Sequence, residues 1–271
     1  MPSIRVGAAL TRIPPARYFR EHGLIELHPS TSFPKQGTLT RWREDVPEAC
    51  EIAIAVPRRM QAGKSGAFAF EKEGARTYLN DAIRIFKPRF VVLFTGAELS
   101  TSTRDRAALK AFVADVQSKG AQVIWQPRGL WDAEDALKLA AEGGFHVALD
   151  LLAETVPAAE PRALAYGRVS AMGTHARLGD GHLRRALEDA LSTGAEEVRL
   201  IIESEDAFKK AARLAGIVTG LADEDSGLGL PRRAGDEDED EDDLEDDGAV
   251  TGEEDDDDDD EDEDDDEDDE E

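Results

Sequence analysis

The sequence contains one cysteine, Cys50, and no apolar run long enough to cross a membrane. A single cysteine can form no disulfide within the chain and cannot build a cysteine-rich zinc site. The opening residues, MPSIRVGAAL, hold an apolar run shorter than the roughly 7–15 residues of a secretory signal. These absences exclude a transmembrane protein and a disulfide-stabilised scaffold, and we expect a cytoplasmic protein.

The end of the chain lacks basic and aromatic side chains. Residues 236–271 include 30 acidic residues and none that is basic, whereas the first 235 residues hold 32 basic and 30 acidic side chains and all 16 aromatic residues. A block of like charges with so little apolar surface cannot build a core. We therefore predict a disordered acidic tail at 236–271, a flexible linker at 217–235 and a folded domain at 1–216. The folded part has no basic excess, so we expect neither nucleic acid nor a membrane as a partner.

Eight short apolar runs recur through the folded part, and several are rich in β-branched residues. They lie at residues 4–10, 24–28, 51–56, 89–94, 121–126, 145–152, 165–172 and 197–202. Between several of them, apolar residues follow the spacing of a one-sided helix, as in Leu183, Ala186, Leu187 and Ala190. The pattern predicts alternating strands and helices.

Such alternation favours parallel strands joined by right-handed crossovers, and eight units can close into a ring. We predict a single-domain α/β fold, a (β/α)8 TIM-like barrel. Pro157 and Pro161 leave at most a turn in place of the sixth helix. An open doubly wound sheet remains the alternative.

The helix ends are also marked in the sequence. Ser102, Asp132 and Ser204 stand where a side-chain oxygen can accept from free backbone N–H groups at a helix start. Glycines that adopt a left-handed conformation often end helices. Four glycines follow the predicted helices: Gly120, Gly143, Gly194 and Gly216.

Three stretches carry landmark residues in an order typical of a known family. The first, LIELHPSTSFPKQGTLTRWREDVPEACEIAIAVPRR, contains Glu26, Phe33, Pro34, Trp42, Pro47 and Arg58. The second, VIWQPRGLW, contains Arg128 and Trp131, and the third, AYGRVSAMGTH, contains Arg168. With these residues the chain resembles the YecE-like family (domain of unknown function 72), which comprises single-domain barrels of no established activity. The resemblance covers residues 4–216.

The polar rim departs from the pattern of that family. The family's opening Gly–x–Ser–Gly–Trp is reduced here to Gly7 followed by two alanines, and Gln126 takes an acidic position. Glu203 and Ser204 stand where the family has paired asparagines. If that rim carries the family's activity, the resemblance implies that this member has lost it or has changed its ligand, so whether the protein is an enzyme stays open.

In barrels of this type, active sites lie at the carboxyl ends of the strands. Polar residues there are Glu26, His28, Arg58, Glu98, Gln126, Arg128, Asp150, Arg168, His175, Glu203 and Glu205. Glu26 is the foremost candidate for a catalytic role, because an acid inside an apolar strand needs a partner or becomes protonated. The other interpretation is a structural ion pair between Glu26 and one of the arginines.

The predicted ligand contacts share polar or aromatic chemistry at the strand ends. They are Arg58, Arg128, Arg168, Trp131, His175 and Glu203. Guanidinium groups suit phosphate or carboxylate groups, although they could instead neutralise neighbouring acids. Trp131 could line a pocket or belong to the core. Nothing in the spacing of the acids and histidines requires a metal, so we predict none, and the sequence identifies no cofactor.

The segment AGKSG at residues 62–66 has part of a phosphate-binding loop signature. The signature requires a glycine five residues before Gly63, and that position is Arg58. We therefore interpret the segment as a surface loop.

Two functions fit these features. In the first, the barrel binds a small polar or anionic ligand at its carboxyl face. Such a barrel could be an enzyme or could have lost its activity. In the second, the protein is a non-catalytic interaction protein, and its polyanionic tail binds a basic protein partner or covers the barrel mouth. A tail that only confers solubility is the simplest account of residues 236–271.

Overall fold

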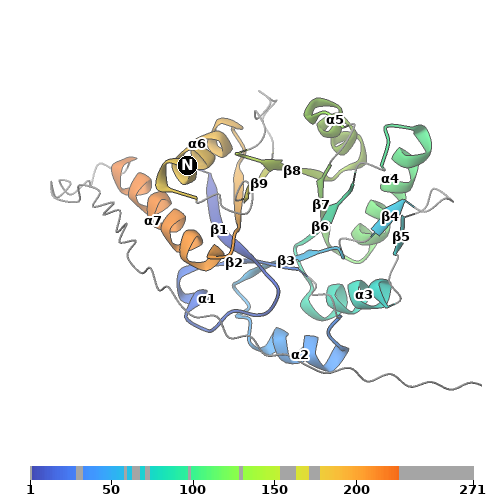
Figure 1. The fold of residues 1–271 in the computed structure, drawn as a ribbon, viewed down its shortest axis with the longest axis horizontal. Helices are drawn as coiled ribbons and strands as arrows, with labels where there is room; N and C mark the ends of the chain where they lie inside the picture. Colours follow the sequence, from blue (N-terminus) through green and yellow to red (C-terminus); the bar gives the residue numbers. More distant parts are fainter. Residues whose placement is uncertain are drawn as a thin grey trace, which may run out of the picture. The chain divides into compact units, whose positions relative to one another are not determined.

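Eight parallel strands form a closed ring in the computed structural model, and helices surround it (Figure 1). The structure describes residues 2–28, 33–57, 60–62, 68–70, 74–96, 99–127, 131–152, 163–170 and 178–225. The predicted (β/α)8 barrel is confirmed, and the open sheet is excluded. The predicted tail at 236–271, Pro157 and Pro161 lie outside the described residues.

The strands follow one another around the barrel in chain order. They are β1 (Ser3–Leu10), β2 (Leu24–Leu27), β3 (Glu51–Ala55), β6 (Phe90–Phe94), β7 (Gln122–Gln126), β8 (His146–Asp150), β9 (Leu164–Ser170) and β10 (Glu197–Glu203). Pairing of β1 with β10, from Ser3↔Glu197 to Ala8↔Ile202, closes the ring. Every predicted apolar run is a strand. The sequence did not predict the antiparallel pair β4 (Met60–Ala62) and β5 (Phe68–Phe70), which lies outside the ring.

Seven helices are described, and the N-caps predicted at Ser102 and Asp132 are confirmed. The hydroxyl of Ser204 donates to Asp206 Oδ1 at 2.9 Å instead of accepting from a backbone N–H group of the helix that follows it. The helices are α1 (Tyr18–Glu21), α2 (Gln36–Glu44), α3 (Ala75–Phe86), α4 (Thr103–Ser118), α5 (Ala133–Gly143), α6 (Asp180–Ser192) and α7 (Ala207–Asp225). Ser102 Oγ accepts from the N–H of Asp105 at 3.2 Å, and Asp132 Oδ1 accepts from the N–H of Asp135 at 2.7 Å. None of these described helices is both long and apolar enough to span a bilayer.

Two of the four glycines that were predicted to end helices in a left-handed conformation do not do so. Gly120 and Gly194 have positive φ after α4 and α6, but at the end of α5 the residue with positive φ is Gly144 rather than Gly143. Gly216 ends no helix, because α7 continues through it to Asp225. A glycine inside a helix costs only about 1 kcal/mol. Apolar residues of α7 beyond Gly216, including Leu221, pack on the core, and the helix therefore extends into the segment expected to be linker.

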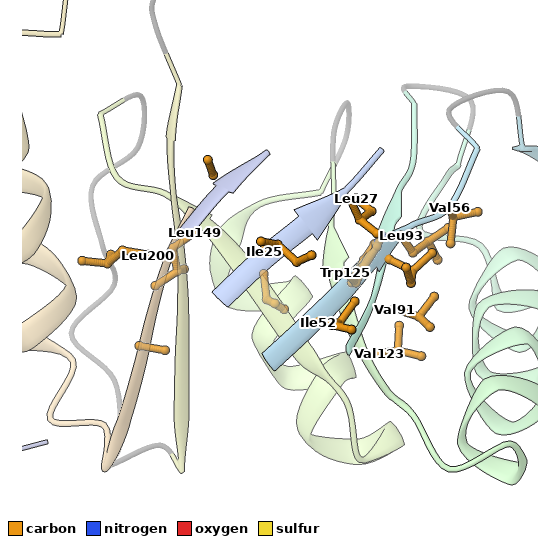
Figure 2. Close-up of a cluster of buried hydrophobic side chains, with 14 of the residues drawn as sticks. Ile25, Leu27, Ile52, Val56, Val91, Leu93, Val123, Trp125, Leu149 and Leu200 are labelled. Carbon is orange, nitrogen blue, oxygen red and sulfur yellow. The ribbon is translucent and has the colours of Figure 1, made fainter. Parts of the chain in front are cut away.

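Alternation along the strands divides the core into two layers. One set of side chains points outward and packs beneath the helices, as Ile25, Leu93 and Trp125 do in Figure 2. The other set, which includes Leu24 and Phe90, fills the barrel interior. Glu26 is two residues from Leu24 on β2, so the same alternation turns its side chain inward.

The amino-terminal end of the barrel is closed by an ion network. Glu51 accepts from Arg199 Nε at 2.6 Å and from Arg89 Nη1 at 2.9 Å, and Glu197 contacts Arg199 Nη2 at 2.7 Å. Burial raises the pKa of Glu51, but the hydrogen bonds and charges of Arg199 and Arg89 outweigh burial and hold that pKa below its usual value. Residues at this end of such barrels serve stability, so we assign the network a structural role.

His22 is a buried histidine packed between two aromatic rings. Its ring centroid lies 4.5 Å from that of Tyr18 and 5.9 Å from that of Phe208, and the residue is 2% exposed. Neither ring nitrogen has a hydrogen-bond partner within the described part of the chain. Burial lowers the pKa of His22, so the ring is neutral in the folded protein at pH 7.

We predict that His22→Phe stabilises the protein. The substitution removes two unpaired buried nitrogens, and the free energy of unfolding should rise by about 1–2 kcal/mol at pH 7. In the wild type, the unfolded chain takes up a proton on His22 below its ordinary pKa of 6.5, whereas the folded chain resists it. The free energy of unfolding of the wild type should therefore fall as pH drops below 6.5. The variant lacks His22, so its free energy of unfolding should fall less over the same pH range. Urea unfolding at pH 7.5 and 5.5 measures both effects, and equal pH slopes for the two proteins would contradict the assignment.

Candidate functional site

Glu26 lies near the carboxyl end of β2 and is completely buried. Three side chains donate hydrogen bonds to its carboxylate: Arg168 Nη1 and His28 Nε2 to Oε1, the latter at 2.5 Å, and the Tyr166 hydroxyl to Oε2 at 2.6 Å. Burial alone raises the pKa of Glu26, but the charge of Arg168 and the hydrogen bonds outweigh it and hold the pKa well below its ordinary value. Glu26 is therefore ionised at neutral pH.

Arg168 joins Glu26 to a second carboxylate. Its Nη2 donates to Glu203 Oε2, at the end of β10, at 2.6 Å. Glu203 also accepts from the hydroxyl of Ser170 at 3.3 Å. Burial lowers the pKa of Arg168, but the charges of Glu26 and Glu203 more than reverse this and raise it. One fully buried guanidinium thus bridges β2, β9 and β10.

Aromatic residues enclose this ion cluster. The guanidinium carbon of Arg168 lies 4.9 Å from the ring centroid of Phe94, at the end of β6. The Tyr166 ring packs edge-on against Phe90 deeper in the barrel, with centroids 5.6 Å apart. Burial and the charge of Glu26 raise the pKa of Tyr166 well above its ordinary value. Tyr166 therefore keeps its proton and remains a donor to Glu26.

His28 lies beside the cluster at a point that solvent reaches. Its side chain is 11% exposed, and its ring centroid is 5.6 Å from that of Phe94. Since the ionised carboxylate of Glu26 can only accept, Nε2 of His28 carries the hydrogen in their contact. Nδ1 has no hydrogen-bond partner among the residues that the structure describes.

We call the polar side chains at the carboxyl end of the barrel, which include Glu26, Arg168, Glu203 and Gln126, the mouth. Not all of their hydrogen-bond donors and acceptors have partners. A guanidinium has five N–H bonds, and Arg168 uses one from Nη1 and one from Nη2; its buried Nε has no partner in the described ranges. Gln126, at the end of β7, is 7% exposed, and its Oε1 also has no partner there. An unpaired buried polar group costs about 1–3 kcal/mol. Among the described residues, the carboxyl end of the barrel therefore contains one buried donor and one buried acceptor that are not paired.

The structure brings together three of the predicted site residues, Glu26, Arg168 and Glu203. Arg58, Arg128 and His175 lie outside the described residues. Trp131 packs edge-on against Trp125 with centroids 4.9 Å apart, and its Nε1 donates to the carbonyl of Leu99 at 3.0 Å. Because Trp125 points outward from the barrel, Trp131 belongs to the layer beneath the helices rather than to the Glu26 cluster.

The sequence did not identify Tyr166 or Phe94 as part of the site. Tyr166 lies two residues before Arg168 on β9, so strand alternation alone places both side chains inside the barrel. Phe94 ends β6, and no feature of the sequence separates it from other core aromatics. His28 was included only among the residues of the rim.

Comparison with known proteins addresses the fold. No protein-family model and no curated protein matches the sequence. A solved DUF72 family protein from Enterococcus faecalis V583 matches with a TM-score of 0.59 and 17% identity, over 81% of this chain and 98% of that one. The chain has the barrel fold of a DUF72 protein. A xylose isomerase domain containing protein from Salmonella typhimurium LT2 matches with a TM-score of 0.51 and 15% identity, over 80% and 96% of the two chains.

The resemblance to the YecE-like family is thereby confirmed at the level of the fold. Within the described part of this DUF72-like barrel, no three histidine, cysteine or acidic side chains are arranged to hold a metal ion. The acids of the mouth instead contact a guanidinium. The described side chains of the mouth are therefore held by hydrogen bonds and ion pairs.

We predict that Glu26→Gln destabilises this DUF72-like barrel by about 3–5 kcal/mol at pH 7, because Arg168 keeps its buried charge while losing a charged partner. Glu203→Gln is the matched control. Its side chain is 32% exposed, so we expect a loss of about 1 kcal/mol or less.

The effect of Glu26→Gln should depend on pH. The pKa of Glu26 is lowered from 4.5, so its contribution to stability is present above pH 4.5 and declines as pH falls toward the lower folded pKa. Urea unfolding at pH 7 and at pH 3.5 measures the difference. Equal losses for the two variants would show that Glu26 is not the charge on which Arg168 depends.

Proposed function

We propose that this DUF72-like barrel binds a small polar ligand at its carboxyl face. The observation that carries the proposal is the unused hydrogen-bonding capacity of two buried side chains, the guanidinium of Arg168 and Oε1 of Gln126. Buried polar groups are nearly always paired, and exceptions are often completed by a ligand or water. A molecule with both acceptors and donors fits such a pair of groups.

Access from solvent supports the same location. Glu203 and His28, which contact Arg168 and Glu26 respectively, are partly exposed at 32% and 11% of their side-chain surface. A ligand can therefore approach on the side of β2 and β10. By contrast, the ion network at the amino-terminal end uses its charges on one another and offers no comparable unpaired atom among the described residues.

The charges of the described mouth favour a neutral ligand over an anionic one. Glu26, Glu203 and the half-buried Asp150, which is opposite Arg168 in the β8–β9 register, outnumber the single positive charge of Arg168. A phosphate or carboxylate would meet net negative charge unless Arg58 and Arg128 offset it. Acceptor oxygens suit hydroxyl groups, so we propose a polyol or sugar-like ligand.

The alternative function rests on composition. Thirty carboxylates in residues 236–271 give the chain a strong attraction for a basic protein partner. In that reading the barrel is a scaffold and the tail is the functional part. The basic partner, the role of the tail in covering the mouth and the cytoplasmic location all stay predictions.

A thermal-shift screen of the full chain tests ligand binding. The probes are glycerol, erythritol, xylitol and inositol as neutral polyols, with sugar phosphates, nucleotides and divalent metals as the other classes. A ligand at 100 times its Kd should stabilise the protein by about 2.7 kcal/mol and raise Tm by about 5–10 °C. We expect neutral polyols to give the larger shifts, and shifts only with nucleotides or sugar phosphates would contradict the charge argument.

Gln126→Leu locates the binding at the mouth. The variant removes the unpaired Oε1, so we expect a higher Tm without ligand and a weaker shift with it. Gln122→Leu is the matched control, since Gln122 is the exposed residue at the other end of the same strand. Equal ligand shifts in the two variants would exclude the site at Gln126.

A further inference from the structure

We propose that His28 is a general base that accepts a proton on Nδ1 from a hydroxyl group of the bound ligand, and that Glu26 is the residue that positions it. This inference rests on the proposed function, because it needs a hydroxyl-bearing ligand at the mouth. It adds a chemical step to a site that otherwise only binds.

Glu26 sets the orientation of the His28 ring. The contact between His28 Nε2 and Glu26 Oε1, at 2.5 Å, fixes which nitrogen carries the hydrogen, since the carboxylate accepts and cannot donate. The backbone N–H of His28 donates to the carbonyl of Leu10 at 2.8 Å and holds the residue beside β1. In the neutral ring, Nδ1 is therefore left with its lone pair.

Glu26 is itself held rigidly in place. It has no exposed surface, and Tyr166 and Arg168 hold its two oxygens from β9. A carboxylate fixed in this way cannot turn to follow the ring, so the ring must align with it. The same arrangement of carboxylate and imidazole orients the base in many acyl-transfer enzymes, where it also stabilises the imidazolium that forms.

The proposed proton transfer conserves atoms and charge. The O–H bond of the ligand breaks, an N–H bond forms at Nδ1, and the electron pair stays on the ligand oxygen. The imidazolium keeps its Nε2–H contact with Glu26. Arg168 shares the oxygen Oε1 of Glu26 with His28, and it keeps unused N–H bonds that could stabilise the negative oxygen. The step needs no co-reactant beyond the ligand.

The tautomer of His28 tests the positioning without any ligand. Full-length protein labelled with 15N-histidine gives the protonation state of each ring nitrogen by long-range 1H–15N correlation, with His28→Asn assigning the signals. We expect His28 to carry its hydrogen on Nε2 in the wild type and in Glu203→Gln, and to become a mixture of tautomers in Glu26→Gln. A hydrogen on Nδ1 in the wild type would overturn the proposal, even if Glu26→Gln fails to fold.

The rate at which Nδ1 of His28 is alkylated also tests the proposal. If His28 had only a structural role, this rate would not depend on Glu26. Iodoacetamide, which is uncharged and is therefore not repelled by the acids of the mouth, alkylates unprotonated imidazole nitrogens, and peptide mass spectrometry gives the rate at each histidine. We expect His28 to react while the buried His22 does not, and we expect the His28 rate to fall at least about tenfold in Glu26→Gln, because the ring loses the carboxylate that fixes its tautomer. Equal rates at His28 in the wild type and Glu26→Gln would overturn the proposal. Because neither measurement uses a polyol, a negative ligand screen and a negative result here remain distinguishable.

Discussion

A carboxylate can be buried only if donors replace the water it loses, and in this barrel that requirement joins distant parts of the chain. Glu26 on β2 receives hydrogen bonds from Tyr166 and Arg168 on β9, about 140 residues later in the sequence. The contact crosses the barrel interior, since β1 and β10 separate β2 from β9 around the ring. The closed ring is what makes such a contact possible, and the contact in turn favours closure over an open sheet.

The two ends of the barrel neutralise their buried carboxylates in different ways. At the amino-terminal end, Glu51, Glu197, Arg89 and Arg199 pair with one another in a mutual network. At the carboxyl end, one guanidinium serves two carboxylates and retains unused N–H bonds. An unpaired buried donor costs stability, as the isolated His22 also does, but among the described residues only the cluster at the carboxyl end combines such a donor with ion pairs. The difference between the ends is the physical ground for placing function at the carboxyl face.

The barrel could be predicted from sequence because the patterns of strands and helices are local. Eight apolar runs marked the strands, and helical spacing marked several of the segments between them. Glu26 could be identified as well, since an acid between Ile25 and Leu27 is a local anomaly. Its partner could not be identified, because Arg58, Arg128 and Arg168 were equivalent on sequence alone. The choice of Arg168 depends on the register that aligns β9 with β10 and on the space inside the ring, which are properties of the closed structure. The packing of Trp131 could not be predicted either. Its position near a strand end did not show that it packs on Trp125, which points outward from the barrel.

The charge of the described mouth also bears on the acidic tail. A polyanion approaches a surface when the surface is positive, but here Glu26, Asp150 and Glu203 outnumber the charge of Arg168, whose two terminal nitrogens already contact carboxylates. For residues 236–271 to cover the mouth, Arg58 and Arg128 would have to supply the attraction against this repulsion. A separate basic partner faces no such cost. We therefore propose that the tail and the mouth act independently, the tail through ionic contacts with a basic partner and the mouth through hydrogen bonds with a neutral ligand.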